Sequence, residues 1–210
     1  MFTKTLFPDT LRAINLVSSI PTIKHAYLAG GTALALQLGH RMSVDLDFFT
    51  QKEFDENLVA TELSQIPSFT EDQRAWATVL GRVGETKFSI FYYPYKLIDT
   101  VVSFEGIQVV GKKDIAAMKM HAIGDRGVKR DFIDVFVLAK EFTIDEMVSF
   151  YEEKYGLSDN KLYHLNKGLS IFKDADEDEM PQKLIPIDWE EVKTFFESET
   201  KRLAKERLRI

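Results

Sequence analysis

The chain has 210 residues, 45% of them hydrophobic, and a formal net charge of −6. This suits one large domain, or one domain with a helical extension, and argues against a dedicated nucleic-acid binder, whose usual footprint is basic. The absence of cysteine excludes disulfides and thiol chemistry. Because no apolar run is long enough for a membrane span and the first residues lack a signal-peptide pattern, we expect a cytoplasmic protein that does not bind membranes.

The first predicted elements are a helix, a short strand and a second helix. Residues 8–17 begin with proline and carry apolar residues at helical spacing, which predicts a capped amphipathic helix. Residues 26–29 predict a short buried strand, and residues 32–36 predict the helix that follows it. Gly30 and Gly31 lie between them, where two glycines allow the backbone to turn tightly and to approach a ligand.

This glycine turn is the first candidate binding element. Free N–H groups at the start of a helix face outward and bind anions. We therefore expect Gly30, Gly31 and Thr32 to hold phosphate, and Arg41 either to contact phosphate or to pair with Asp47. The structural alternative is a turn that only begins a helix.

Residues 43–49 predict a strand with two carboxylates on one face. Side chains alternate with a period of two, so Asp45 and Asp47 point together, whereas the apolar residues, Val44 among them, point into a core. Neighbouring carboxylates repel unless a cation lies between them, and Mg²⁺ is bound by one or two carboxylates plus substrate phosphates. The order of strand, turn, helix and acidic strand favours a site for a nucleoside triphosphate with Mg²⁺ or Mn²⁺, although the acidic pair alone is equally typical of a solvated strand face.

The rest of the chain changes from β-rich to helical near residue 112. A helix is predicted over 54–65, and β-branched and aromatic residues between glycines predict strands at 75–83, 87–93 and 100–110, with turns at glycines 84 and 106. The pattern is then helical, with an acidic linker at 174–179. The predicted helices cover residues 113–124, 129–142, 145–155, 162–172 and 189–208.

A second group of charged residues lies in two of these helices. Lys119 has mostly apolar neighbours, which fits either a side chain that snorkels to the surface or one whose charge meets triphosphate oxygens. Asp131 and Asp134 are i, i+3 neighbours, and Asp134 is flanked by apolar residues. An ionised carboxylate there needs a cation, either a metal or a basic side chain in a structural salt bridge. Arg126 is one of the basic residues close enough in sequence to pair with it.

Four strings of residues together resemble a known family. LAGGTALAL at 28–36 and GHRMSVDLDFF at 39–49 resemble the AbiEii/AbiGii toxin group of polymerase-beta-type nucleotidyltransferases. DIAAMKMHA at 114–122 resembles that group's lysine helix, and RGVKRDFIDV at 126–135 resembles its closing motif. The resemblance spans roughly residues 25–140, and the C-terminal third matches only loosely.

The resemblance implies an α+β fold with a polymerase-beta-like nucleotidyltransferase core, a mixed twisted sheet flanked by helices, and a C-terminal helical region. We expect the core over residues 1–142 and a helical extension packed on it over 143–210. The implied activity is magnesium-dependent transfer of a nucleoside monophosphate from a triphosphate to an acceptor, either an RNA such as tRNA or a protein. The implied setting is a bacterial toxin–antitoxin or abortive-infection pair, with a cognate antitoxin as partner.

The resemblance also assigns roles to individual residues. It implies that Asp45 and Asp47 hold the metal and are catalytic together with Lys119 and Asp134. The residues expected at the nucleotide are Gly30, Gly31, Thr32, Arg41, Ser43 and Lys119. The residues expected to contact the acceptor are Arg126, Lys129, Arg130 and Asp131. RNA, if it is the acceptor, should bind modestly and in a salt-dependent way, because the protein is acidic overall.

One departure from the family pattern leaves an alternative open. Polymerase-beta-type enzymes usually carry a third carboxylate on a later strand, but residues 86–93 contain none, so the resemblance implies that Asp134 takes this place. The alternative is a catalytically inactive nucleotide-binding module that acts through a partner; a purely structural protein would leave the acidic pair unexplained. His40, His121 and His164 show no metal-ligand spacing and are expected to be ordinary surface or partly buried histidines.

Overall fold

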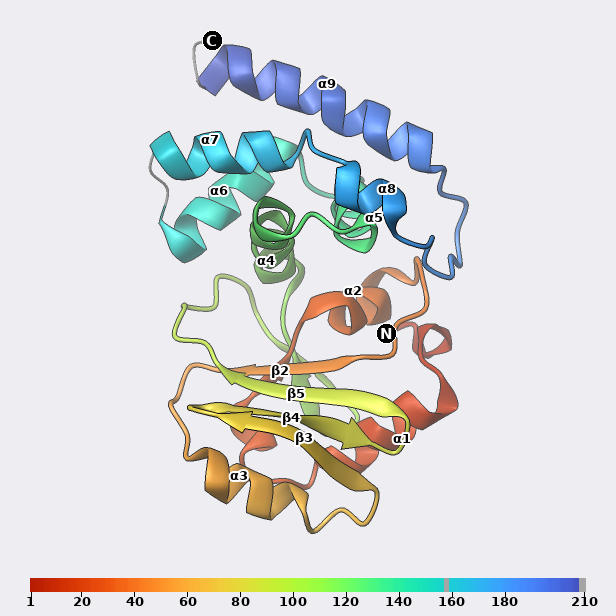
Figure 1. Ribbon diagram of the computed structural model, residues 1–210, viewed down its shortest axis with the longest axis vertical. Coiled ribbons are helices and arrows are strands. Elements are labelled where there is room, and N and C mark those ends of the chain that lie inside the picture. Colours follow the sequence, from red (N-terminus) through yellow and green to blue (C-terminus); the bar gives the residue numbers. More distant parts are fainter. Residues whose placement is uncertain (157–158, 208–210) are drawn as a thin grey trace. The chain divides into compact units, whose positions relative to one another are not determined.

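The computed structural model describes residues 1–156 and 159–207, and these fall into two compact units. We call residues 1–112 the strand unit and residues 113–210 the helical unit. The domain boundary expected after residue 142 lies inside the helical unit, so the expected extent of a nucleotidyltransferase core remains a prediction. Figure 1 shows the strands gathered in one unit and the later helices in the other.

A seven-stranded mixed sheet forms the centre of the strand unit (Figure 1), with the order β3-β4-β5-β2-β1-β7-β6. β2 runs parallel to β5 and β1 runs parallel to β7, while the remaining neighbours are antiparallel. This confirms the predicted α+β class with a mixed sheet. The strands are β1 (Tyr27–Leu28), β2 (Leu46–Thr50), β3 (Phe69–Ala75), β4 (Thr78–Val83), β5 (Thr86–Tyr92), β6 (Val102–Phe104) and β7 (Ile107–Val109).

Three α-helices accompany the sheet within the strand unit. They are α1 (Pro8–Val17), α2 (Gly30–Leu38) and α3 (Glu56–Leu63), with short 3₁₀ helices at Thr3–Thr5 and Ile23–His25. α3 packs against β3 and β4, α1 against β5, and α2 against β2. Leu28, Phe48 and Ile90 are fully buried in the core that results. Burial of such side chains stabilises each by about 1.5–3 kcal/mol.

β2 begins one residue after Asp45, and this changes the predicted position of one side chain. The strand alternates as predicted from Leu46 onward, with Leu46 and Phe48 buried and Asp47 half-buried. Val44, however, is 44% exposed, so its predicted place in the core is wrong. The period of two holds only inside the strand, and Val44 lies in the irregular segment before it.

β3 is the strand that the sequence pattern missed. The prediction began a single strand at residue 75, but Phe69–Ala75 forms its own strand and pairs antiparallel with β4. All its residues after Phe69 are exposed, so no apolar alternation marks it as a strand. The predicted turn at Gly106 is confirmed: Glu105 and Gly106 both have positive φ, of 47° and 80°, between β6 and β7.

The helical unit contains α4 to α9 among the described residues. α5 packs against α8 and α9, and α7 packs against α9. The ring of Phe132 lies at the centre of an aromatic cluster, 5.1 Å from the rings of Phe172 and Phe196 and 6.0 Å from that of Trp189. The helices are α4 (Lys112–Asp125), α5 (Lys129–Leu138), α6 (Ile144–Tyr155), α7 (Asp159–Gly168), α8 (Lys173–Glu177) and α9 (Trp189–Arg207).

The acidic segment predicted as a linker is instead partly helical, because its carboxylates have local partners. α8 occupies most of it, and Asp176 accepts a hydrogen bond from Trp189 Nε1 at 2.7 Å and pairs with Lys193 at 3.3 Å. These contacts tie the segment to the start of α9. Residue 208, at the predicted end of the last helix, lies outside the described residues.

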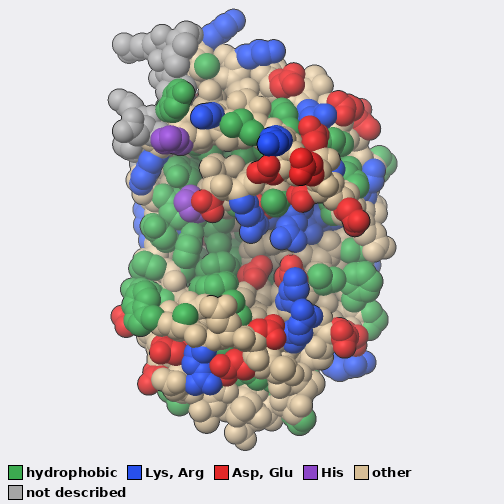
Figure 2. Space-filling model, viewed as in Figure 1, with side chains coloured by type: hydrophobic (Ala, Val, Ile, Leu, Met, Phe, Trp, Pro, Cys, Tyr) green, Lys and Arg blue, Asp and Glu red, His purple; other side chains and the backbone are tan. Residues whose placement is uncertain are grey.

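Within residues 1–156 and 159–207, no helix combines the length and the apolar character needed to cross a membrane. Acidic and basic side chains are interspersed on the visible face of the helical unit in Figure 2. A mixed pattern of this kind gives no single-sign surface that would by itself attract a polyanion.

Candidate functional site

Asp45 and Asp47 are half-buried and line the same pocket in the strand unit. Asp47 points away from the core side of β2, because its neighbours Leu46 and Phe48 are fully buried. Ser89 lies directly opposite Asp47 on β5 and donates a hydrogen bond from its hydroxyl to Asp47 Oδ1 at 2.6 Å. The hydrogen bond fixes the orientation of the carboxylate at the position where the acidic pair meets the pocket.

The glycine turn brings backbone close to this carboxylate. Gly30 has a φ of 66°, which a residue with a side chain rarely adopts, and a Cβ at this position would lie 3.1 Å from Asp47 Oδ2. The backbone N–H of Ala29 donates to the carbonyl of Asp47 at 2.9 Å. α2 begins at Gly30, two residues earlier than predicted, and its N-cap residue Ala29 makes no side-chain cap. The start of α2 and the acidic pair are therefore adjacent.

Arg41 packs against the other glycine of the turn. Its guanidinium is almost fully buried, Nη1 donates to the carbonyl of Met42 at 3.0 Å, and Nη2 lies so close to Gly31 that a Cβ there would overlap it. The predicted cation thus lies at the start of α2. Charge-assisted hydrogen bonds from a guanidinium suit phosphate oxygens.

Thr32 and Ser43 connect α2 to the segment before β2. The hydroxyl of Thr32 donates to the carbonyl of Asp45 and shares a second hydrogen bond of 2.9 Å with the hydroxyl of Ser43. Both residues are buried, so these hydroxyls hold the loop that positions Asp45. Their predicted direct contact with nucleotide remains a prediction.

The oxygen donors of the acidic pair fit a hard divalent cation. Two carboxylates two residues apart and a backbone turn that approaches one of them supply the ligand chemistry that Mg²⁺ and Mn²⁺ prefer. Among the described residues, no group of three or more His, Cys, Asp or Glu side chains is arranged to hold a metal. The remaining ligands of a cation here would therefore come from substrate phosphates and water, as is usual for Mg²⁺.

In the helical unit, Lys119 lies between two carboxylates. Its ammonium is 2.8 Å from Asp131 Oδ1 and 2.7 Å from Asp134 Oδ2, and all three side chains are buried. Arg126 Nε donates to Asp131 Oδ2 at 2.9 Å. Lys119 therefore does not snorkel to the surface, and the cation that Asp134 needs is present as a buried ion pair. The catalytic roles expected for Lys119 and Asp134 remain predictions.

The charges around Asp131 lower its pKa. Burial of Asp131 opposes ionisation, but the Lys119 ammonium and the hydrogen bonds from Arg126 and Lys119 outweigh burial and hold the pKa of Asp131 below its ordinary value. Asp131 is thus ionised in the folded protein at neutral pH. Its carboxylate is engaged on both oxygens, which leaves little capacity for the acceptor contact that was expected of it.

We expect acid to destabilise the protein partly through Asp131. Because the pKa of this group is lower in the folded chain than the value of about 3.9 in an unfolded chain, its contribution to stability is fully present above that pH and is lost as the pH falls through the folded pKa. Urea unfolding between about pH 6 and about pH 2 measures this loss. Asp131→Asn should flatten the acid limb relative to the wild type, and an equally steep limb would contradict the assignment.

The predicted acceptor-binding cluster is only partly available. Lys129 is buried, its ammonium bonds the carbonyl of Asp178 and lies 5.4 Å from the ring of Trp189, and its backbone N–H donates to Asp178 Oδ2 at 2.9 Å. These contacts occupy Lys129 within the helical unit. Arg130 is exposed and Arg126 is half-exposed, so an acceptor contact through these two residues remains a prediction.

One buried ion pair was missed by the sequence reasoning. Lys154 Nζ lies 2.6 Å from Asp114 Oδ1, and both side chains are fully buried. The pair joins α4 to α6. The sequence did contain a signal for this pair. Lys154 lies on the same helix face as apolar residues such as Tyr151, and that face of α6 is buried.

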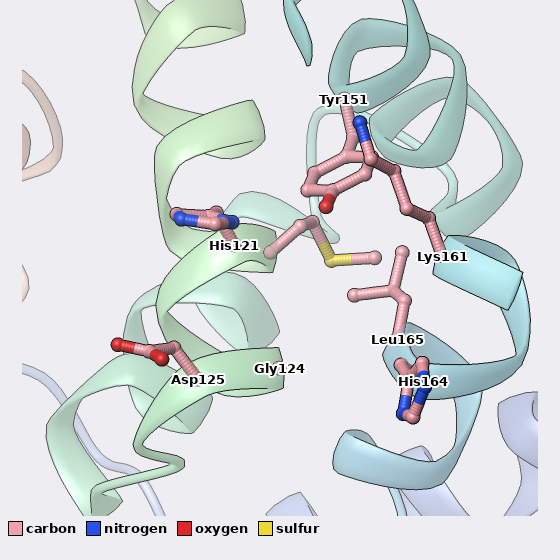
Figure 3. Close-up of a pocket in the computed structure, with 8 residues that line it drawn as sticks. His121, Gly124, Asp125, Tyr151, Lys161, His164 and Leu165 are labelled. Atoms are coloured by element: carbon pink, nitrogen blue, oxygen red, sulfur yellow. The ribbon is translucent and has the colours of Figure 1, made fainter. Parts of the chain in front are cut away.

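A separate pocket of about 190 Å³ lies within the helical unit (Figure 3). His121 and Asp125 border it from α4, Tyr151 from α6, and His164 and Lys161 from α7. Both histidines are exposed, and the ring of His121 lies 5.0 Å from that of Tyr155. They behave as the ordinary histidines that were predicted, whereas His40 is fully buried rather than at the surface.

The sequence of this chain matches a protein-family profile and a protein of similar length. The sequence profile of the family described as "Nucleotidyl transferase AbiEii toxin, Type IV TA system" matches residues 18–105 and 93–206. The uncharacterized protein aq_aa25 of Aquifex aeolicus (strain VF5) is 35% identical over 204 residues, which cover 94% of this chain and 97% of the relative.

Two solved structures from Helicobacter pylori share the fold. JHP933 has a TM-score of 0.55 and 22% identity, with 93% of this chain and 89% of JHP933 covered. A putative nucleotidyltransferase has a TM-score of 0.55 and 21% identity, with 93% of this chain and 92% of that chain covered.

Proposed function

Because this chain belongs to the AbiEii nucleotidyltransferase toxin family, we propose that it transfers a nucleoside monophosphate from a nucleoside triphosphate to an acceptor hydroxyl, with Mg²⁺ or Mn²⁺ as the metal. The acceptor is an RNA such as tRNA, or a protein. The physiological partner is a cognate antitoxin. Asp45 and Asp47 hold the metal, and Gly30, Gly31 and Arg41 hold phosphate.

The close approach of the glycine turn to Asp47 supports this function. A Cβ on Gly30 would lie 3.1 Å from Asp47 Oδ2, so the uncapped start of α2 and a carboxylate face the same small volume. A helix start favours an anion, whereas a carboxylate repels one. The two are compatible when a cation lies between the carboxylate and the phosphate, which is the arrangement of a metal-bound triphosphate.

The transfer needs no reactant besides the triphosphate and the acceptor. The acceptor oxygen forms a bond to the α-phosphorus, the bond from that phosphorus to the bridging oxygen breaks, pyrophosphate leaves with the electron pair, and the acceptor proton passes to solvent. A bound divalent cation would supply electrostatic stabilisation of the charge on the phosphate oxygens. Asp45 and Asp47 hold the cation, and Ser89 orients Asp47. The guanidinium of Arg41, which lies beside the start of α2, neutralises charge on the phosphate.

The direct test measures pyrophosphate release from each of the four labelled nucleoside triphosphates, with Mg²⁺ or with a chelator. Bacterial total RNA and a denatured protein mixture serve as separate acceptors. Metal-dependent release with label in one acceptor supports the proposal. Triphosphate binding without pyrophosphate release under any of these conditions would favour the inactive nucleotide-binding module instead.

We expect Gly31→Val to abolish triphosphate binding while the protein stays folded. The valine side chain would clash with Arg41 Nη2, so it would both displace the guanidinium and block the start of α2. Gly31 is not among the positive-φ glycines, so the backbone accepts the change without strain. Calorimetry with Mg²⁺ and triphosphate measures binding, and the melting temperature controls for folding. Normal triphosphate binding by the folded variant would show that the turn is only structural.

A further inference from the structure

The pocket in the helical unit has no role in the proposed transfer. It has a volume of about 190 Å³ and lies between α4, α6 and α7, as Figure 3 shows. This volume is below the range of about 300–1,000 Å³ that is typical of sites for drug-sized ligands, so the pocket suits a molecule smaller than a nucleotide. We call it the helix pocket and define it by Met120, Gly124, Asp125, Tyr151, Lys161 and Leu165.

The floor of the helix pocket is apolar. Met120 and Leu165 are 0% and 3% exposed, and Tyr151 is 7% exposed beside them. α4 and α7 are in close contact at one point, because a Cβ on Gly168 would lie 2.9 Å from Gly124 Cα. A Cβ on Gly124 itself would lie at the ordinary contact distance of 4.0 Å from Leu165 Cα and Cδ1. The missing side chain at Gly124 therefore leaves an open groove above a packed floor.

The rim of the helix pocket carries charges of both signs. Asp125 on α4 is exposed, and no described residue forms a hydrogen bond or an ion pair with its carboxylate. Lys161 on α7 is exposed too, and its ammonium donates to the carbonyls of Tyr155 and Gly156 at 3.0 and 3.1 Å. These bonds hold the ammonium at the C-terminal end of α6. In Figure 3, Asp125 and Lys161 lie on opposite sides of the pocket and on separate helices.

Charges of both signs restrict the chemistry of the ligand. A simple anion is attracted by Lys161 and repelled by Asp125, and a simple amine meets the reverse, so neither uses the whole rim. An uncharged apolar molecule uses the floor alone. A molecule that joins an ammonium, a carboxylate and an apolar group forms charge-assisted hydrogen bonds at both sides of the rim and covers the floor as well.

We propose that the helix pocket binds a free α-amino acid with an apolar side chain. The ammonium of the ligand pairs with Asp125, its carboxylate pairs with Lys161, and its side chain covers the apolar floor. Leucine, methionine and phenylalanine have this combination of groups. The site shares no residue with the acidic pair or the glycine turn, so the proposal does not depend on nucleotidyl transfer. Because the ligand binds the folded helical unit, it stabilises the protein against unfolding.

An NMR titration of the full ¹⁵N-labelled chain with L-leucine, L-methionine and L-phenylalanine tests the proposal. At least one of them should bind saturably. Two analogues of the tightest ligand then separate its charges; for leucine they are 4-methylpentanoate, which lacks the ammonium, and 3-methylbutylamine, which lacks the carboxylate. Each analogue should bind roughly tenfold to a hundredfold more weakly, because it loses one charge-assisted hydrogen bond.

Three variants of the pocket test the assigned contacts. Asp125→Asn and Lys161→Met nearly keep the size of the side chain, remove one charge, and should each weaken binding roughly tenfold or more. Gly124→Ala adds a methyl group that faces Leu165 across the groove and should also weaken binding. Its melting temperature should stay the same or rise, because the φ of Gly124 is not positive and alanine favours the helix.

Matched variants in the same unit control for general effects. Asp174→Asn changes an exposed aspartate on α8, and Lys167→Met changes an exposed lysine on α7; neither residue lines the pocket. Both controls should bind the amino acid as the wild type does. Melting temperatures of all the variants, measured without ligand, show whether each one is folded.

The results decide the proposal either way. Binding that is weakened in the pocket variants and retained in the controls supports it, as does weaker binding of both analogues. It is overturned if none of the three amino acids binds, or if either analogue binds as tightly as its parent amino acid. Unchanged affinity in folded Asp125→Asn and Lys161→Met proteins overturns it as well, because the amino acid then binds elsewhere.

Discussion

Asp47→Asn should reduce nucleotidyl transfer by about two to three orders of magnitude and remove the magnesium dependence of triphosphate binding. The substitution keeps the shape of the side chain and an oxygen that accepts the hydrogen bond from Ser89. It removes the negative charge that faces the glycine turn. The expected loss is therefore electrostatic, because a neutral amide is a poor ligand for Mg²⁺ compared with a carboxylate.

Pyrophosphate release and calorimetry with and without Mg²⁺ measure this effect on one preparation. Asp9→Asn is a matched control, since Asp9 lies on α1, is half-exposed and pairs only at the surface with Arg12. The control should behave as the wild type does. If folded Asp47→Asn and Asp45→Asn proteins still bind triphosphate in a magnesium-dependent way, the acidic pair does not hold the metal.

Lys119→Met should cost about 3–5 kcal/mol in the free energy of unfolding, which is the usual result of removing one partner from a buried ion pair. The substitution leaves Asp131 and Asp134 buried, with Arg126 still paired with Asp131. Asp134→Asn should cost far less, because Lys119 keeps its 2.8 Å pair with Asp131 and the amide oxygen still accepts a hydrogen bond.

This difference makes Asp134→Asn an informative variant for catalysis. If Asp134 completes the active site, the variant should keep a melting temperature near that of the wild type and lose transfer activity by orders of magnitude. Urea unfolding and pyrophosphate release on the same preparation separate the two effects. Full specific activity together with a large loss of stability would assign Asp134 to structure alone.

The parts of the fold that follow local rules were predicted from the sequence. The glycine turn, the acidic strand and the five long C-terminal helices depend on backbone freedom and apolar periodicity within a short window, and the family resemblance is confirmed. Within the site, the glycine turn lies near Asp47 because β1 pairs antiparallel with β2. A short stretch of sequence indicates this pairing only through the order of the strands and helices.

The parts that failed depend on partners distant in sequence. Lys129 was predicted to contact the acceptor at the surface. Its partner Asp178 lies 49 residues away, and no residue near Lys129 in sequence indicates that contact. The pair of Lys154 and Asp114 spans 40 residues, so the local pattern can place Lys154 on a buried helix face but cannot identify its partner. Ser89 was not singled out either, because its importance arises only from its register opposite Asp47.

The outer strand β3 has a consequence for how the protein behaves in concentrated solution. Strands at the edge of a sheet present unpaired backbone groups to which another chain can add. β3 exposes Glu71, Asp72 and Arg74, and its register against β4 shifts between Glu71 and Gln73, which indicates a bulge. Charges and a bulge prevent this edge from pairing with a further strand. The polar composition of β3, because of which the sequence pattern did not predict it, therefore also protects the sheet from edge-to-edge aggregation.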